Sequence, residues 1–105
     1  VDRKKDMIKT GGENVASREV EEAIYTIPGV SEVAVIGLPD SRWIEAVTAV
    51  VVAKSGHTLT EDGLVAACRE RLGGFKVPKR IILTDALPKN PSGKLLKREL
   101  RTQYA

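Results

Sequence analysis

The chain has 105 residues, of which 42% are hydrophobic and 30% charged, with a formal net charge of +3. This length fits one small domain, and the composition is typical of a soluble globular fold. No apolar run is long enough for a membrane span, and the chain combines a weak positive charge with too few aromatic residues for a typical nucleic-acid surface.

The cysteine content and the first residues indicate the compartment and the context of the chain. A single cysteine, Cys68, excludes a disulfide within the chain and fits a reducing compartment, so we expect a cytoplasmic protein. The opening residues VDRKKD carry neither an initiator methionine nor a secretion signal, and we expect them to continue a longer chain.

The first 29 residues predict a hairpin and a helix. Met7 to Thr10 and Val15-Ala16 flank a turn that contains Gly-Gly, which is a common hairpin signal. Ser17 is expected to cap a helix with an acidic first turn and apolar residues at helical spacing. Pro28-Gly29 should end that helix.

The middle of the chain predicts two strands and a second helix. A strand is expected over 33–36, broken by the glycine and proline that follow it. Residues 46–53 are more continuously apolar and should form a strand that is buried on both faces. Thr60 should cap a helix that stops at Gly73-Gly74.

A third strand is expected over 80–84, and a short helix from about Ser92. The resulting order is hairpin, helix, two strands, helix, strand, helix. We therefore predict an α+β fold: a small sheet of about three strands covered by two helices, with an N-terminal β-hairpin and a short C-terminal helix.

Residues 88–98, PKNPSGKLLKR, place Lys94 where the last helix is expected to begin. A cation at this end of a helix is unfavourable unless an anion lies there, and free N–H groups beside an ammonium form an anion site. A P-loop is excluded, because its pattern requires glycine at Pro88 and serine or threonine at Leu95. The motif indicates one cation on an exposed turn that is aimed at an anion; the alternative is a solvated lysine.

Three further segments admit a functional and a structural interpretation. Gly11-Gly12 provides a strand edge against which a thin ligand could lie, or simply a hairpin turn. Arg3 could reach a phosphate from a hinge, or belong to a charged linker. Trp43 lies in a predicted loop and favours a binding platform over a core position.

The remaining candidates favour a structural role. His57 is expected at the surface and Cys68 in the core. The sequence contains no metal-ligand spacing and no Ser/His/Asp set.

Three separated motifs together resemble one known family. The segments DRKKDMIKTGGENVASREVEEAI, GLPDSRW and FKVPKRIILTDALPKNPSGKLLKREL are similar to the C-terminal domain of adenylate-forming enzymes, in the same order. GGENV and the tryptophan loop most resemble the fatty acyl- and aryl-CoA synthetases. The resemblance implies that residues 1–105 form the C-terminal lid domain of an AMP-forming acyl-CoA synthetase.

The resemblance also implies the chemistry of the whole enzyme. Such enzymes join a carboxylic acid, here expected to be a fatty acid, to AMP with ATP and Mg²⁺, and then transfer the acyl group to CoA. A large N-terminal domain, the partner of this lid, binds the ATP, Mg²⁺ and acid. The lid alone is expected to be inactive.

Site residues follow from the resemblance position by position. Lys94 matches the lysine that serves adenylation, Arg3 an arginine that contacts the phosphate or ribose of ATP or AMP, and Lys5 the hinge. The hairpin from Lys9 to Asn14 would serve thioester formation. The residues at CoA-binding positions are Lys9, Gly11, Gly12, Glu13, Trp43, Phe75 and Lys79.

Two departures and two alternatives remain open. Many relatives carry Trp-Gly-Glu where this chain has Trp43-Ile44-Glu45, so we expect CoA to approach differently there. Val77 stands where some relatives place a phosphate-binding arginine. The acceptor could instead be the thiol of a carrier protein, or the chain could be a binding module without catalysis.

Overall fold

The computed structural model describes residues 7–42, 44–93 and 95–104, and of Phe75 only the backbone. These residues form one mixed sheet, three α-helices and a short 3₁₀ segment. In chain order the elements are β1 (Met7–Thr10), β2 (Glu13–Ala16), α1 (Ser17–Tyr25), β3 (Val30–Asp40), β4 (Ile44–Ala53), α2 (Glu61–Arg71), η2 (Gly74–Lys76), β5 (Arg80–Thr84) and α3 (Lys97–Tyr104).

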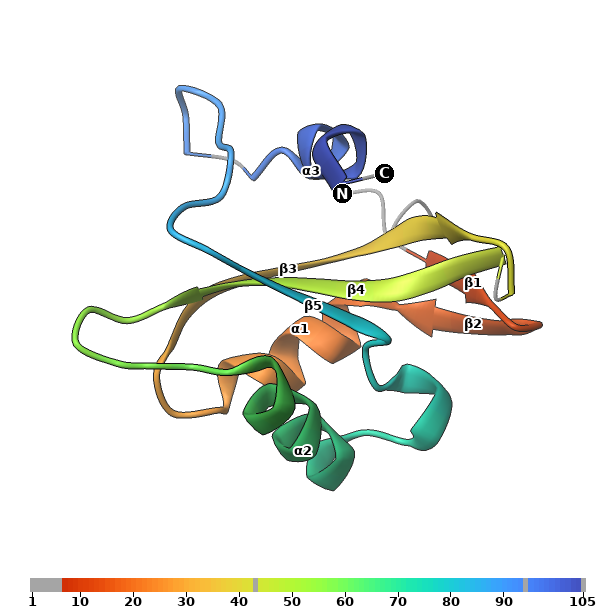
Figure 1. The fold of residues 1–105 in the computed structure, drawn as a ribbon. Helices are drawn as coiled ribbons and strands as arrows, with labels where there is room; N and C mark the ends of the chain where they lie inside the picture. Colours follow the sequence, from red (N-terminus) through yellow and green to blue (C-terminus); the bar gives the residue numbers. More distant parts are fainter. Residues whose placement is uncertain (1–6, 43, 94, 105) are drawn as a thin grey trace.

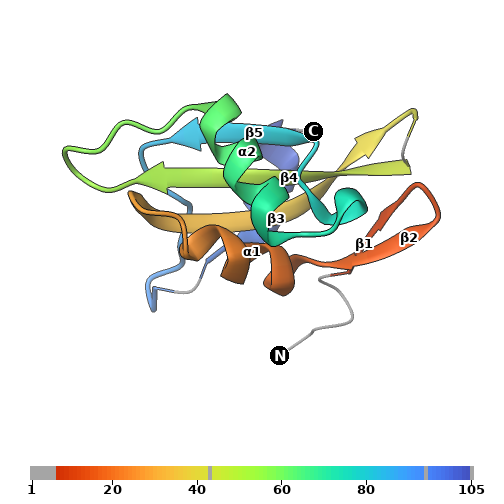
Figure 2. The same cartoon turned by 90° about the horizontal axis from the view of Figure 1, so that it is seen from below.

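The centre of the sheet is a long antiparallel pair, β3 and β4, with β5 parallel to β4 on its other side. The β1–β2 hairpin joins this sheet at the start of β4. Helices α1 and α2 cover one face, and α3 lies on the opposite face (Figures 1 and 2). The predicted α+β class is therefore confirmed, and the C-terminal helix supplies a third layer.

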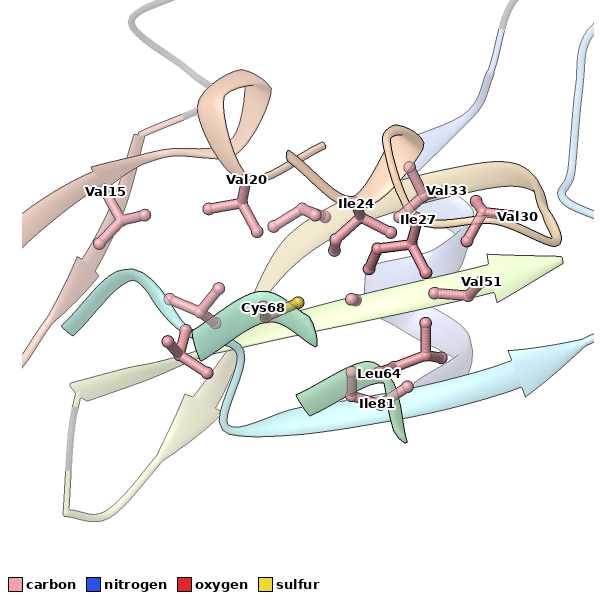
Figure 3. Packing of buried hydrophobic residues seen from close by; sticks show 14 of the residues in the cluster. Val15, Val20, Ile24, Ile27, Val30, Val33, Val51, Leu64, Cys68 and Ile81 are labelled. Carbon is pink, nitrogen blue, oxygen red and sulfur yellow. The ribbon is translucent and has the colours of Figure 1, made fainter. Parts of the chain in front are cut away.

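The larger core lies between the sheet and the two helices α1 and α2. Figure 3 shows aliphatic side chains from α1, β3 and the hairpin meeting Leu64 and Cys68 of α2. Cys68 is fully buried, and this burial raises the pKa of its thiol, while Arg71 opposes the shift. The predicted core role of Cys68 is confirmed, and a thiol held neutral is a poor nucleophile.

A second core on the other face explains why β4 is apolar at consecutive positions. Val50 and Val52 point toward α3, whereas Val47, Ala49 and Val51 belong to the larger core. Leu100 of α3 is 1% exposed in the second core. The prediction that this strand is buried on both faces is confirmed.

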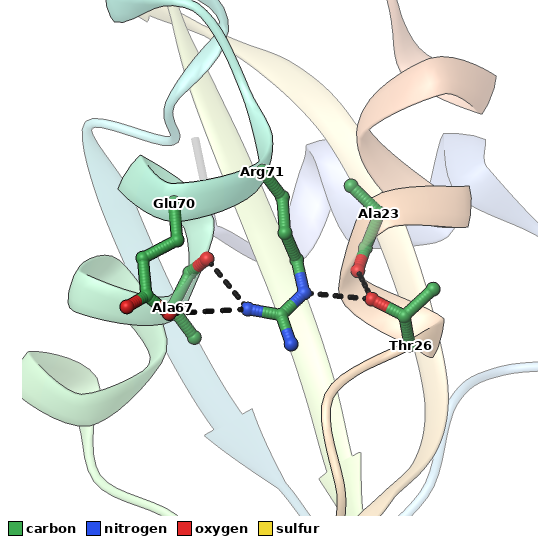
Figure 4. A network of polar contacts seen from close by, with 5 residues as sticks. All are labelled: Ala23, Thr26, Ala67, Glu70 and Arg71. Carbon is green, nitrogen blue, oxygen red and sulfur yellow. Dashed lines mark hydrogen bonds and ion pairs between the residues drawn. The ribbon is translucent and has the colours of Figure 1, made fainter.

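A polar contact also joins α1 to α2, as Figure 4 shows. Arg71 Nε donates to Thr26 Oγ1 at 2.7 Å, and Thr26 Oγ1 donates to the Ala23 carbonyl. Arg71 Nη1 donates to the Ala67 carbonyl of its own helix and lies 3.6 Å from Glu70 Oε1. One guanidinium therefore links the C-terminal ends of both helices.

The two central strands are longer than the sequence predicted. The prediction that β3 breaks at its glycine and proline is wrong, since the strand continues to Asp40. A Cβ at Gly37 would lie 3.0 Å from atoms of Glu45 and Ile8, so this glycine permits close packing inside the strand. Pro39 is tolerated because β3 lies at the edge of the sheet.

The two predicted helix caps differ in outcome. Thr60 Oγ1 accepts from the Gly63 N–H at 3.1 Å, so the cap of α2 is confirmed. Ser17 does not cap α1: the N-cap is Ala16, and Ser17 is the buried first residue of the helix. Its hydroxyl accepts from Lys97 Nζ at 3.1 Å instead.

The last helix starts later than predicted. It begins at Lys97, and Ser92 belongs to a turn in which both its N–H and its hydroxyl bond to Asn90 Oδ1. The prediction of a helix from about Ser92 is therefore wrong, since the Gly93 N–H bonds to the Asn90 carbonyl in a local turn. The position predicted for Lys94 lies outside the described residues. No helix among the described residues has the length and hydrophobicity of a membrane span.

Candidate functional site

The tip of the β1–β2 hairpin is exposed, and its two glycines present only backbone atoms. Gly11 and Gly12 have φ values of 56° and 85°, as a two-residue turn of the type favoured in hairpins requires. A Cβ at Gly12 would meet nothing within 4 Å, so only conformation demands glycine there. Lys9 and Glu13 flank the turn and are exposed.

Within the described part of the chain, one residue pair joins the hairpin to β4, Thr10 with Ile44. Each residue of this pair has a feature that costs stability. Ile44 has φ 71° and is 68% exposed, although a β-branched residue in this region is strained. The hydroxyl of Thr10 is buried and has no hydrogen-bond partner among the described residues. Glycine in the Trp-Gly-Glu sequence of many relatives would adopt this φ without strain.

One side chain reinforces the joint. Glu45 Oε1 accepts from the backbone N–H of Lys9 at 2.9 Å. The carboxylate therefore replaces a strand-to-strand hydrogen bond between β1 and β4. Among the described residues, β1 meets β4 through this contact and the Thr10–Ile44 pair, without a long ladder, while Ile8 and Val15 hold the hairpin to the larger core.

A second exposed segment, residues 88–97, forms a closed loop. Leu96 N donates to the Pro88 carbonyl at 2.9 Å, and Lys89 pairs with Leu95 as an isolated bridge. Lys89 Nζ also forms an ion pair with Glu32 of β3. The base of this loop is thus tied both to itself and to the edge of the sheet.

These two segments lie at opposite ends of the domain. The hairpin tip and the turn near residue 92 point away from each other in both views (Figures 1 and 2). Strand β2 lies beside η2, which leads to Lys79. The hairpin and the 74–79 segment, which together hold most of the described CoA-binding candidates, therefore share one end.

A groove of about 500 Å³ lies next to this segment. It is lined by Val65, Arg69, Gly74, Val77, Pro78 and Lys79. Arg69 is a basic residue that sequence reasoning missed, because an arginine in the last turn of a helix is ordinary. The groove combines two cationic side chains with an apolar wall, which suits an anion attached to a flat ring.

Several predicted site residues lie outside the described residues: Arg3, Lys5, Trp43, Lys94 and the side chain of Phe75. His57 is exposed, as predicted. Among the described residues, no three His, Cys, Asp or Glu side chains come together to hold a metal ion.

Comparison with known proteins identifies the family. The AMP-binding enzyme C-terminal domain family matches residues 19–94. The chain belongs to this family. The resemblance inferred from the three motifs is therefore confirmed.

Three relatives show how far the similarity extends. The long-chain-fatty-acid–CoA ligase FadD13 of Mycobacterium tuberculosis is 52% identical, over 99% of this chain and 20% of the ligase. The feruloyl-CoA synthase of an Amycolatopsis species is also 52% identical, over 99% of this chain and 21% of the synthase. The structure of a Mycobacterium tuberculosis fatty acyl CoA synthetase superimposes with a TM-score of 0.90 at 52% identity, over 95% of this chain and 20% of that one. This chain thus spans about one fifth of these relatives.

Proposed function

We propose that the chain is the mobile lid of an AMP-forming acyl-CoA ligase and works with an N-terminal domain that holds ATP, Mg²⁺ and the acid. The observation that carries this proposal is the separation of the hairpin and the 88–97 loop at opposite ends of one domain. Two ends that point apart serve one active site only in turn. A lid that reorients between two half-reactions has this property.

In the first half-reaction the 88–97 loop faces the N-terminal domain. The Lys94 ammonium then lies near the carboxylate and the α-phosphate of ATP, where it stabilises negative charge that develops in the transition state. Arg3 contacts the nucleotide, and the chain pivots about Lys5. The chain alone is inactive, because a lysine without positioned substrates provides little acceleration.

In the second half-reaction the hairpin end faces the N-terminal domain. Gly11 and Gly12 expose bare backbone, which allows the thin pantetheine arm of CoA to lie against it. Lys9 and Glu13 flank the path of the arm, and Trp43 and Phe75 stack on the nucleotide. The thiol of CoA then attacks the acyl carbonyl of the acyl-AMP, forming the thioester as the acyl–phosphate bond breaks and AMP leaves with the thiol proton lost to solvent.

The groove beside Lys79 supports free CoA as the acceptor. Lys79 and Arg69 provide two cations for the phosphates of the CoA nucleotide, and Arg69 takes the place of the arginine that Val77 replaces. A carrier-protein arm lacks this nucleotide and would gain nothing from the groove.

The proposal also includes the acid substrate and the compartment. FadD13 is named for long-chain fatty acids and the Amycolatopsis synthase for feruloyl-CoA, although both share 52% identity with this chain. The acid is therefore chosen in the N-terminal domain, and a fatty acid is our assignment. A reduced, buried Cys68 fits the cytoplasm.

The test is a Lys94→Ala variant of the chain joined to its N-terminal domain. We expect acid-dependent exchange of pyrophosphate into ATP to fall by about 100-fold or more, the scale of losing one transition-state charge contact. Acyl transfer from preformed acyl-AMP to CoA should change by less than about twofold, since transition-state contacts affect only the step that forms them.

Lys54→Ala is the matched control, because Lys54 is an exposed lysine in the turn after β4 and has no role in either proposed half-reaction. It should leave both half-reactions unchanged. Equal losses of adenylation and transfer in Lys94→Ala would contradict the assigned role.

A further inference from the structure

The most buried of the ion pairs among the described residues joins α1 to α3. Lys97 Nζ lies 2.8 Å from Glu21 Oε2, and each side chain is 17% exposed. By contrast, the Arg18–Glu22 pair on α1 is 63% and 68% exposed. A pair so far removed from water is directional and holds its partners in a fixed geometry.

This pair crosses the edge of the sheet. Glu21 approaches from the α1 face and Lys97 from the α3 face, and they meet beside β3, the outermost strand on that side. Glu21 Oε2 also accepts from the backbone N–H of Val35 at 2.9 Å. Lys97 Nζ donates in addition to the buried Ser17 hydroxyl at 3.1 Å. The Glu21–Lys97 pair, the Val35 N–H and the Ser17 hydroxyl thus form one hydrogen-bonded network, which we call the clamp.

The clamp fixes one end of the 88–97 loop. Lys97 is the last residue of this loop and the first of α3. At the loop's other end, Lys89 pairs with Glu32 of the same strand. The Lys89–Glu32 pair therefore ties the loop directly to β3. The Lys97–Glu21 pair ties it to α1 and, through the bond from Val35 N–H to Glu21, indirectly to β3. The backbone hydrogen bond from Leu96 N to the Pro88 carbonyl completes the base.

We propose that Glu21 and Lys97 are positioning residues for adenylation. They hold the base of the 88–97 loop against β3, so that the cation carried by this loop reaches the reacting carboxylate and phosphate in one orientation. The inference rests on the proposed function of Lys94. Neither Glu21 nor Lys97 contacts substrate; each acts through the loop.

The kinetic consequence follows from where the ligands are held. The N-terminal domain binds ATP and acid before the cation contributes to the transition state. Loosening the clamp should therefore lower kcat for adenylation by about 10- to 100-fold, since small misplacements of a catalytic group have this cost. The KM values for ATP and acid should change by less than about threefold, because ground-state binding is untouched.

The experiment uses Lys97→Met in the chain joined to its N-terminal domain, with the neighbouring Arg98→Met as control. Both changes remove one positive charge, but Arg98 is exposed. We expect Lys97→Met to lower kcat of pyrophosphate exchange while acyl transfer from preformed acyl-AMP stays within about twofold. Lys97→Arg should restore most of the lost rate, and Arg98→Met should behave as the parent protein.

Glu21→Gln provides a second variant that keeps the side-chain shape and an acceptor for Val35 N–H. It should lower adenylation in the same selective way, even if Lys97→Met fails to fold. Equal losses in both half-reactions, or normal adenylation in Glu21→Gln, would overturn the inference. If Lys94→Ala abolishes adenylation but Glu21→Gln does not, only the clamp is wrong; if Lys94→Ala is fully active, the proposed function itself fails.

Discussion

The two ends of this domain are built in opposite ways. The Lys89–Glu32 ion pair ties the 88–97 loop to the sheet edge, and the Lys97–Glu21 ion pair ties it to α1. A backbone hydrogen bond from Leu96 N to the Pro88 carbonyl closes the loop. Among the described residues, the backbone pairing of the β1–β2 hairpin with β4 is limited to Thr10 and Ile44, of which Ile44 is strained and Thr10 has a buried hydroxyl without a hydrogen-bond partner. The 88–97 loop is therefore held by ion pairs, whereas the junction of the hairpin with β4 contains a strained residue.

This difference fits the two proposed tasks. A cation that stabilises a transition state must be held in one place, and rigid anchoring achieves this. A hairpin that admits a long flexible arm benefits from a short backbone pairing with the sheet. Strain of this kind is often retained next to functional sites at a cost in stability.

The largest stability effect should come from relieving the strain at Ile44. We expect Ile44→Gly to raise the free energy of unfolding by about 1–2 kcal/mol, the usual cost of a left-handed L-residue. Equilibrium urea unfolding measures this change. Glycine in an ordinary strand position destabilises by roughly 0.5–1 kcal/mol, so a loss of stability would contradict the strained joint.

A smaller effect is expected from the buried hydroxyl of the same pair. Thr10→Val removes an unpaired polar group at constant shape and should raise the free energy of unfolding by about 1 kcal/mol. Thr48→Val is the matched control, because Thr48 is equally buried but its hydroxyl donates to the Ala46 carbonyl at 3.1 Å. That change should be neutral or destabilising; the same gain at both positions would show that the missing hydrogen bond is not the cause.

Local signals predicted much of the fold. Thr60 capped α2 as expected, because the cap depends on residues within one turn. The Gly-Gly turn and the third strand were also located correctly. Failures arose where distant contacts override local preference: Gly37 lies within a strand because Ile8 and Glu45 pack against it, and Ser17 bonds Lys97, 80 positions away, instead of its own helix.

The candidate site was predictable only in part. Motif resemblance named the hairpin and Lys79 as candidates, and their roles stay predictions. Nothing in an isoleucine signals that Ile44 has a positive φ. Arg69 and the Glu21–Lys97 clamp depend on which elements meet in three dimensions, so residue type and spacing did not reveal them.

The central claim, that the two ends serve different half-reactions in turn, is tested most directly at the strained end. Gly12→Asn keeps the left-handed turn, which asparagine tolerates, but adds a side chain where the arm of CoA would lie. Gly56→Asn is the control, since Gly56 has φ 80° and open space in a turn away from the hairpin.

The measurement is a rapid-quench time course with ATP, acid and CoA on the chain joined to its N-terminal domain. We predict that Gly12→Asn forms acyl-AMP at the parent rate, accumulates about one equivalent per enzyme, and releases acyl-CoA at least about tenfold more slowly. Gly56→Asn should match the parent protein throughout. Slow acyl-AMP formation in Gly12→Asn, or acyl-CoA release at the parent rate, would contradict the account.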